Sequence, residues 1–187
     1  MLVELNVDLT VGIVGTRDPD DNQAMLARHS ADTLSSVYKC GITTGGADGI
    51  DLAAMLGTAP GHLTVYLPWE SYKWDTIPAH AKRVVAHPQL HATWFESVDL
   101  YHPAPERIGR GVRALHARNY GIVEHDDLLL AFPNHTGGGG TGQTIRIAKA
   151  LGIPVIQVKR GSAPISKEEF IERVLDALKL KEITLGS

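Results

Sequence analysis

Glycine and small polar residues concentrate in three stretches of the sequence, and each stretch follows a short apolar run. They read GTRDPDD at 15–21, TTGGADGID at 43–51 and NHTGGGGTGQT at 134–144. Glycine lets backbone amides approach a ligand, and a helix that begins at such a loop adds free N–H groups and the positive end of its dipole. We therefore expect these loops to hold a phosphate group, although tight turns alone would also explain glycine at any single loop.

The spacing of the glycines does not match two familiar phosphate motifs. Gly12 and Gly15 are spaced as G-x-x-G, which differs from the G-x-G-x-x-G dinucleotide fingerprint. No lysine follows the last glycine of the third stretch, as a P-loop requires. A nicotinamide-dependent hydride transfer and a P-loop ATPase reaction are therefore not favoured.

Four polar side chains near these loops are candidates for ligand binding. Arg17 and Arg118 can each offer a planar, bidentate donor to phosphate. Asn119 interrupts an apolar helical stripe, so it must either brace a neighbouring loop or contact a ligand. Asp51 is placed to accept hydrogen bonds from a ribose or base, whereas Asp48 is interpreted as a helix cap.

Aromatic, histidine and cysteine residues give weaker signals. Trp69 follows an apolar run, where its ring could stack on a base or simply pack. His87 and His91 are four residues apart, but Pro88 between them opposes a helix that presents both, and no acidic third ligand is suitably spaced. No metal site is expected, and Cys40 is interpreted as a small buried residue.

Apolar runs alternate with helix-like segments along the chain. Five runs are predicted strands, at 9–15, 41–46, 63–68, 127–133 and 153–159. They are continuously apolar, as in a parallel sheet whose two faces are both covered by helices. The predicted fold is α/β, a three-layer, doubly wound, mostly parallel sheet.

Helices are predicted between and after these strands, within a single domain over 1–187. Their expected bounds are 22–39, 49–56, 79–86, 105–125, 142–151 and 166–180. Gly152 is expected to end the fifth of them in a left-handed conformation, with Pro154 beyond it. The segment of about 69–105 is rich in proline and histidine, and we interpret it as an insertion near the strand ends.

The composition of the chain narrows the classes of partner that the protein is expected to bind. Lys and Arg number 18 against 21 Asp and Glu, for a net charge of −3, so no overall basic excess favours nucleic acid. The single cysteine excludes an internal disulfide framework. No secretory signal is recognisable, and the apolar runs are too short to span a bilayer, so a cytoplasmic location is expected.

Five blocks of the sequence resemble the SLOG superfamily of Rossmann-like domains, which includes the DprA, YspA and Lonely-guy families. The blocks are GIVGTRD (12–18), TTGGADGIDLAA (43–54), LPW (67–69), RNYGIVEHDDLLLAFP (118–133) and GGGGTGQTIRIAKALGIPVI (137–156). The YspA-like and DprA-like branches are the most similar. The resemblance implies a Rossmann-like fold, a nucleotide or nucleotide-derived ligand in the crevice of the sheet, and a homo-oligomer.

The loops and the resemblance together give a set of predicted nucleotide-binding residues. They are Gly15, Thr16, Arg17, Gly45, Gly46, Ala47, Asp51, Trp69, Arg118, Asn119, Pro133, Gly137, Gly138, Gly139, Gly140, Thr141 and Gln143. No cofactor besides the nucleotide is expected.

The resemblance also decides between holding a nucleotide and cleaving it. Lonely-guy enzymes hydrolyse the N-glycosidic bond of nucleoside monophosphates with an arginine, at a position like that of Arg118, and a glutamate. Thr144 stands at the glutamate position, beside Gln143, and a hydroxyl cannot replace a catalytic carboxylate. Binding without catalysis is therefore favoured, and no catalytic residue is assigned.

Two rival functions remain. The first is hydrolysis or base transfer at the N-glycosidic bond with a substitute carboxylate from Glu124, Asp126, Asp51 or Glu70. The second is single-stranded DNA binding of the DprA kind, which the acidic balance of the chain does not favour.

Overall fold

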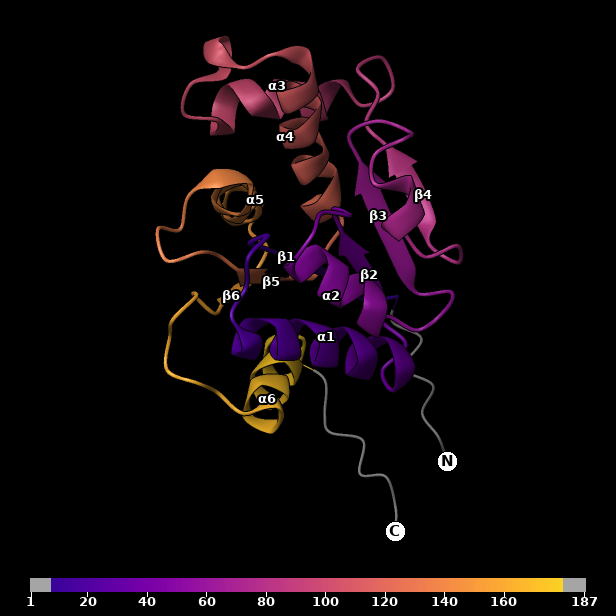
Figure 1. The fold of residues 1–187 in the computed structure, drawn as a ribbon, viewed down its shortest axis with the longest axis vertical. Coiled ribbons are helices and arrows are strands. Elements are labelled where there is room, and N and C mark those ends of the chain that lie inside the picture. Colours follow the sequence, from indigo (N-terminus) through magenta and orange to yellow (C-terminus); the bar gives the residue numbers. More distant parts are fainter. Residues whose placement is uncertain (1–7, 180–187) are drawn as a thin grey trace.

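A computed structural model describes residues 8–179, which form a single six-stranded sheet with helices on both faces (Figure 1). The strand order is β4-β3-β2-β1-β5-β6, and every pairing is parallel. The strands are β1 Thr10–Gly15, β2 Gly41–Thr44, β3 Leu63–Leu67, β4 Lys82–Val85, β5 Leu128–Phe132 and β6 Val155–Gln157. The predicted fold class, a doubly wound three-layer α/β sheet, is confirmed.

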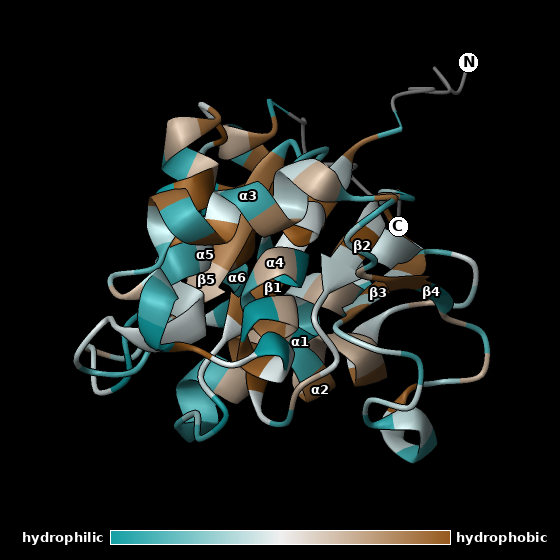
Figure 2. Cartoon of the chain, turned by 90° about the horizontal axis from the view of Figure 1, so that it is seen from above, coloured by the Kyte–Doolittle hydropathy of each residue, from teal (hydrophilic) through white to brown (hydrophobic). Residues whose placement is uncertain are grey.

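The helices form the two outer layers. They are α1 Asp21–Ser36, α2 Ile50–Gly57, α3 Ala92–Tyr101, α4 Arg110–Val123, α5 Gly139–Ala150 and α6 Lys167–Ala177, with short 3-10 turns at Trp74–Thr76 and Pro105–Arg107. Side chains of α1, α2 and α6 share one core with the sheet, whereas those of α4 and α5 share the core on the other face. Loops at the periphery are mostly hydrophilic or neutral (Figure 2).

Strand β5 shows why the sequence forms this architecture. Its five residues are all fully buried, with Leu128, Leu130 and Phe132 in the core under α1 and α6. Leu129 and Ala131 point to the opposite core under α4 and α5. A strand covered on both faces must be apolar at every position, which is the pattern that the sequence carries.

The prediction of a helix at 79–86 is wrong, because this segment contains the edge strand β4. Its residues pair with β3 from Thr64 opposite Lys82 to Leu67 opposite Val85. Prolines at 78 and 88 bracket the segment, and its two valines are β-branched, so pairing with the open edge of β3 outweighs a weak helical tendency. The segment of about 69–105, interpreted as an insertion, thus extends the sheet by a strand and contributes α3, which packs against α4.

The other predicted helices are present with shifted ends, and the largest shift is that of α4, which was predicted to begin at 105 but begins at Arg110, after the 3-10 turn Pro105–Arg107. Helix α5 begins at Gly139, inside the glycine run, where the sequence predicted a start at 142. It ends as predicted, since Gly152 has a φ of 75° directly after its cap. The predicted C-terminal helix is α6, although its expected last residue at 180 lies outside the described residues.

Strand order reverses between β1 and β5, which places a crevice at their carboxyl ends. From β1 the chain proceeds outward through β2, β3 and β4, and then returns to place β5 and β6 on the other side of β1. The loops that follow β1 and β5 diverge to helices on opposite faces, so they leave a gap. None of the helices within residues 8–179 is long and apolar enough to cross a membrane.

Candidate functional site

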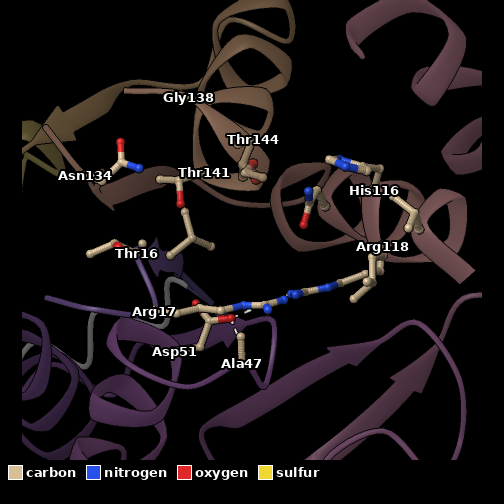
Figure 3. Close-up of a pocket in the computed structure, with 17 residues that line it drawn as sticks. Thr16, Arg17, Ala47, Asp51, His116, Arg118, Asn134, Gly138, Thr141 and Thr144 are labelled. Atoms are coloured by element: carbon tan, nitrogen blue, oxygen red, sulfur yellow. Dashed lines mark hydrogen bonds and ion pairs between the residues drawn. The ribbon is translucent and has the colours of Figure 1, made fainter. Parts of the chain in front are cut away.

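A cavity of about 480 Å³ lies at this crevice (Figure 3). Its size falls within the range of small-molecule sites. Its walls come from the loops after β1, β2 and β5, the first turns of α5 and one face of α4. The lining residues are Val14, Gly15, Thr16, Arg17, Ala47, Asp51, Val112, Leu115, His116, Arg118, Asn119, Asn134, Gly138, Gly139, Gly140, Thr141 and Thr144.

Backbone contacts of Thr16 hold two of the loops against each other. The amide of Thr16 donates to the carbonyl of Phe132 at 2.9 Å, and its own carbonyl accepts from the amide of Ile50 at 3.1 Å. Gly49, at a φ of 75°, lies so close that a Cβ there would be 2.4 Å from the Thr16 carbonyl oxygen. Glycine is therefore required at 49 both by its conformation and by the close approach of the chain.

The first turn of α5 presents unpaired backbone amides. The cap residue Gly138 makes no side-chain cap, and the amides of Gly139, Gly140 and Thr141 have no acceptor among the described residues. Asn134 holds the preceding turn, because its Oδ1 accepts from the amide of Gly137 at 2.9 Å. Free N–H groups at the positive end of a helix dipole favour an anion in the cavity.

Arg118 brings a buried positive charge to the opposite wall. Only 7% of this residue is exposed, its Nη1 lies 3.8 Å from Asp51 Oδ2, and its Nε has no partner among the described residues. The guanidinium lies on the backbone of Gly45, where a Cβ would be 1.2 Å from Nη1, so no larger residue fits there. Burial lowers the pKa of Arg118, and the Asp51 carboxylate opposes that shift.

Asp51 and Arg17 complete the charge distribution around Arg118. Burial raises the pKa of Asp51, and the positive charge of Arg118 opposes that shift. The Oδ2 of Asp51 also accepts from the amide of Ala47 at 3.1 Å. Arg17 is exposed, makes no ion pair with any described residue, and contributes to lowering the pKa of Arg118. Two arginines facing a single carboxylate leave this wall with a net positive charge.

A buried amide network lies beside the first turn of α5. The Oε1 of Gln143 accepts from Asn119 Nδ2 at 2.9 Å and contacts His116 Nδ1. Gln143 is fully buried, and its Nε2 has no partner among the described residues. Asn119 thus has the polar partner that its place in an apolar stripe requires.

The structure gathers most of the predicted site residues around the cavity. Gly15, Thr16, Arg17, Ala47, Asp51, Arg118, Asn119 and Gly138 to Thr141 all line it. Gly45, Gly46, Trp69, Pro133, Gly137 and Gln143 do not. Gly45 lies under Arg118 and Gln143 lies behind Asn119, so these two act on the cavity through other side chains. That the gathered residues bind a nucleotide stays a prediction.

Trp69 stands near the cavity without lining it. Its ring makes an edge contact with Tyr72, with centroids 5.2 Å apart, and 40% of the residue is exposed. A Cβ on Gly111 would be 3.8 Å from the Trp69 ring, which places this ring beside the first turn of α4.

Sequence reasoning did not select Val14, Val112, Leu115, His116, Asn134 or Thr144 for the set of binding residues, although all of them line the cavity. Helical spacing contained a usable signal for part of this group. Val112, Leu115 and His116 lie seven, four and three residues before Asn119, so all four share one face of α4. The sequence interpretation treated the apolar members of that face as core.

Among the substitute carboxylates considered for hydrolysis, Asp51 alone belongs to the described lining of the cavity. Asp126 is buried against Thr43, whose hydroxyl donates to both carboxylate oxygens at 3.0 and 2.9 Å. Glu124 accepts from Trp94 Nε1 at 2.9 Å, and Glu70 is exposed.

The structure also tests the predictions for Asp48 and Cys40, and it contradicts the first. Asp48 does not cap α2, because the cap residue is Gly49 and the Asp48 carboxylate instead pairs with Lys73 Nζ at 2.6 Å. The chain turns back on itself between these two residues, which the local sequence does not reveal. Cys40 is buried, as expected. Within the described residues, no three His, Cys, Asp or Glu side chains gather as a metal site.

No protein-family model and no curated protein matches the sequence. Solved structures match the fold, and two of them show what the likeness covers. One is DNA processing protein A from Helicobacter pylori, studied for its single-stranded DNA binding mode. It is 17% identical, with 89% of this chain and 73% of that chain covered and a TM-score of 0.58. This chain has the DprA-type Rossmann-like fold.

The second match is the molybdenum cofactor binding protein from the phototrophic bacterium Rippkaea orientalis. It is 17% identical, with 92% of this chain and 87% of that chain covered and a TM-score of 0.57. The Rossmann-like fold that the resemblance implied is thus confirmed. At this identity the two structures establish the shared architecture, and the ligand must be argued from the residues of this chain.

Proposed function

We propose that this protein binds a nucleotide or nucleotide derivative, with its phosphate against the first turn of α5 and its charge balanced by Arg17 and Arg118. The observation that carries the proposal is the partly paired guanidinium of Arg118, which is buried in the wall of a cavity that also contains uncapped helix amides. Burying a charge without full pairing is costly. A bound anion would supply the missing partner.

The rest of the lining supports a ligand with an apolar, flat part. Val14, Val112 and Leu115 line the same cavity as the donors, and small-molecule sites combine such apolar surface with a few polar groups. We place the base beside Val112 and Leu115 and the ribose between it and the phosphate. Trp69 then serves at most as an outer contact, since it does not line the cavity. Both structural neighbours bind ligands, which agrees with a binding role for the fold.

The sharpest test places a side chain at Gly138, at the start of α5, where we propose that the phosphate binds. This residue has an extended conformation at φ −91° that any side chain tolerates, and an added Cβ would meet only Thr136 Oγ1 at an ordinary 3.6 Å. Gly139 suits the test less well, because its φ of 70° would strain any other residue. We therefore expect Gly138→Val to obstruct the ligand without straining the fold.

The measurement is ligand-induced thermal stabilisation with AMP, GMP, CMP, UMP, NAD and inorganic phosphate. A ligand at a hundred times its Kd stabilises the folded state by about 2.7 kcal/mol, which corresponds to a rise in Tm of roughly 5 to 10 °C for a chain of this size. In Gly138→Val the ligand should no longer raise the Tm, while the Tm without ligand should equal that of the wild type. The matched control is Gly41→Val at the amino end of β2, where a Cβ meets only ordinary contacts, and it should retain the rise. An undiminished rise of the Tm in Gly138→Val would show that the phosphate does not bind against the first turn of α5.

Hydrolysis of the N-glycosidic bond is the enzymatic rival, and it would depend on Asp51. That carboxylate already faces Arg118 and the Ala47 amide. We expect chromatography of AMP, dAMP and NAD, incubated with concentrated protein, to find no released base. Release that disappears in Asp51→Asn would establish the rival instead.

Single-stranded DNA binding is the second rival, because one structural neighbour has that property. It predicts a mobility shift with oligonucleotides that weakens steeply as salt increases. We expect no shift at low salt, since the net charge is −3.

A further inference from the structure

His116 lies in the wall of the proposed phosphate site, and one of its ring nitrogens already has a hydrogen-bond partner. His116 lines the cavity together with Thr141 (Figure 3) and with Asn119 and Gly140. Its Nδ1 contacts Gln143 Oε1. Asn119 Nδ2 donates to the same oxygen, so Oε1 acts as an acceptor and His116 Nδ1 must be the donor. Nε2 is then the nitrogen that remains for a ligand.

The groups around His116 come from three elements and are mostly positive or neutral. The ring of His102, from the end of α3, makes an edge contact with centroids 4.5 Å apart, and His102 Nδ1 accepts from the Ala104 amide. Arg118 on α4 and Arg146 on α5 add positive charge, and Gln143 on α5 adds the neutral acceptor. The main causes of the shift of the His116 pKa are burial, the hydrogen bond to Gln143 and the charges of His102, Arg118 and Arg146, and none of these is a carboxylate.

We propose that His116 is the third cationic donor of the anion site, charged when the ligand is bound, and that the site thereby selects a terminal phosphate monoester over a phosphodiester. This inference rests on the proposed function. A monoester near neutral pH carries close to two negative charges, because its second pKa is about 6, whereas a diester carries one. The additional charge has a partner only if His116 also takes up a proton.

The direction of the coupling follows from the surroundings of the ring. Burial lowers the pKa of His116 in the free protein, and the hydrogen bond to Gln143 opposes that shift. The free ring is therefore mostly neutral at pH 7. A dianion beside Nε2 favours the charged ring and raises its pKa, so binding takes up a proton and strengthens as the pH falls from 8 towards 7. One linked proton limits the change to about tenfold in affinity per pH unit.

Isothermal titration calorimetry with AMP tests this coupling. Titrations at pH 7 in two buffers of different ionisation enthalpy measure the number of protons taken up, and we expect a value between zero and one. AMP should bind about tenfold or more tightly than its methyl phosphodiester, given the strength of an added ion pair near a protein surface. Inorganic phosphate should bind with lower affinity and show a smaller net proton uptake, because a large part of it is a monoanion at pH 7 and releases a proton when it binds as the dianion.

The matched variants are His116→Gln and His125→Gln. Glutamine keeps an N–H donor at 116 but cannot titrate there, so both the proton uptake and the preference over the methyl ester should fall towards zero. His125 lies beyond the opposite end of α4 with 81% of its side chain exposed, and its variant should behave like the wild type. If His116→Gln does not fold, the wild-type uptake and the comparison with the methyl ester still decide.

The outcomes separate the two proposals. AMP that binds without proton uptake, or a methyl ester that binds as tightly, would overturn the role of His116 and leave nucleotide binding intact. Absence of binding by AMP, the other nucleotides and inorganic phosphate would overturn the proposed function itself.

Discussion

Two carboxylates are buried among residues 8–179, and their neighbours give them different roles. Asp51 faces the guanidinium of Arg118 at 3.8 Å, whereas Asp126 has the hydroxyl of Thr43 as its hydrogen-bond donor. Gly12 lies so close that a Cβ there would be 2.2 Å from Asp126 Oδ2. Burial raises the pKa of Asp126 well above its ordinary value. Asp51 belongs to the cavity, and Asp126 belongs to the fold.

The raised pKa of Asp126 predicts how Asp126→Asn changes stability with pH. The folded protein holds the Asp126 proton more tightly than the unfolded chain, whose aspartate pKa is about 3.9. The stability contributed by that proton is complete below pH 4 and is lost as the pH rises through the folded-state pKa. Asparagine has the same shape and cannot ionise. The variant should therefore match the wild type near pH 4 and become the more stable of the two by pH 8.

Urea unfolding between pH 4 and pH 8 measures this difference. Asp75→Asn, on an exposed turn, is the control and should follow the wild type throughout. A constant gap between Asp126→Asn and the wild type at every pH would contradict the assignment.

At the scale of elements, the site depends on loops held together by backbone contacts. Gly49 is where the loop after β1 meets the start of α2, since a Cβ there would lie 2.4 Å from Thr16 O and 2.6 Å from Arg17 C. The obstructing atoms are backbone, which cannot rotate away. The glycine therefore fixes the distance between two walls of the cavity.

We expect Gly49→Ala to destabilise the protein by about 1 to 3 kcal/mol from backbone strain alone, with more from the clash. Thermal unfolding gives the magnitude. Gly109→Ala is the matched control, because Gly109 also precedes a helix but has a φ of −75° and open space around its Cβ. A Gly49→Ala variant as stable as Gly109→Ala would show that the two loops are not tightly coupled.

Helix α5 illustrates how much of an element its own sequence determines. Its end was predictable, because Gly152 and Pro154 are local stop signals. Its start was not, because glycine has a low helix propensity and the run 137–140 was expected to be loop. Helix α5 instead begins inside the glycine run, and Gly142 N donates to Gly138 O.

At the scale of the whole molecule, Gln23 connects the first helix by hydrogen bonds to the residues that directly follow the last two strands. Its Nε2 donates to the carbonyls of Pro133 at 2.9 Å and Val158 at 2.8 Å, and the residue is fully buried. Asp20 adds a second tie, since its Oδ2 accepts from the Gly161 amide at 2.8 Å. These bonds join segments that are more than a hundred residues apart in the sequence.

Gln23→Ala should lower the free energy of unfolding by about 1 to 3 kcal/mol, because it leaves the Val158 carbonyl without its donor, whereas the Pro133 carbonyl keeps the amide of Arg160 as a donor at 3.0 Å. Chemical denaturation measures the change. Gln89→Ala, at an exposed turn, should change it by less than about 0.5 kcal/mol. Equal effects for the two variants would mean that the Val158 carbonyl finds another partner, such as water.

The sequence by itself determined the doubly wound sheet and the edge at which its glycine loops meet. Both follow from local signals, because strands buried on two faces must be continuously apolar and tight turns need glycine. It also placed Arg17, Arg118 and the α5 glycines at one site, since loops at the carboxyl ends of parallel strands converge.

Only the tertiary structure decided the identity of β4, the burial of Asp126 and the contact between His116 and Gln143. A short segment with mixed propensity becomes a strand only when the edge of β3 is there to pair with it. Likewise, the partners of a polar side chain lie on other elements, here 83 residues away for Asp126 and Thr43 and 27 for His116 and Gln143. No local pattern records such distances, because folding sets them.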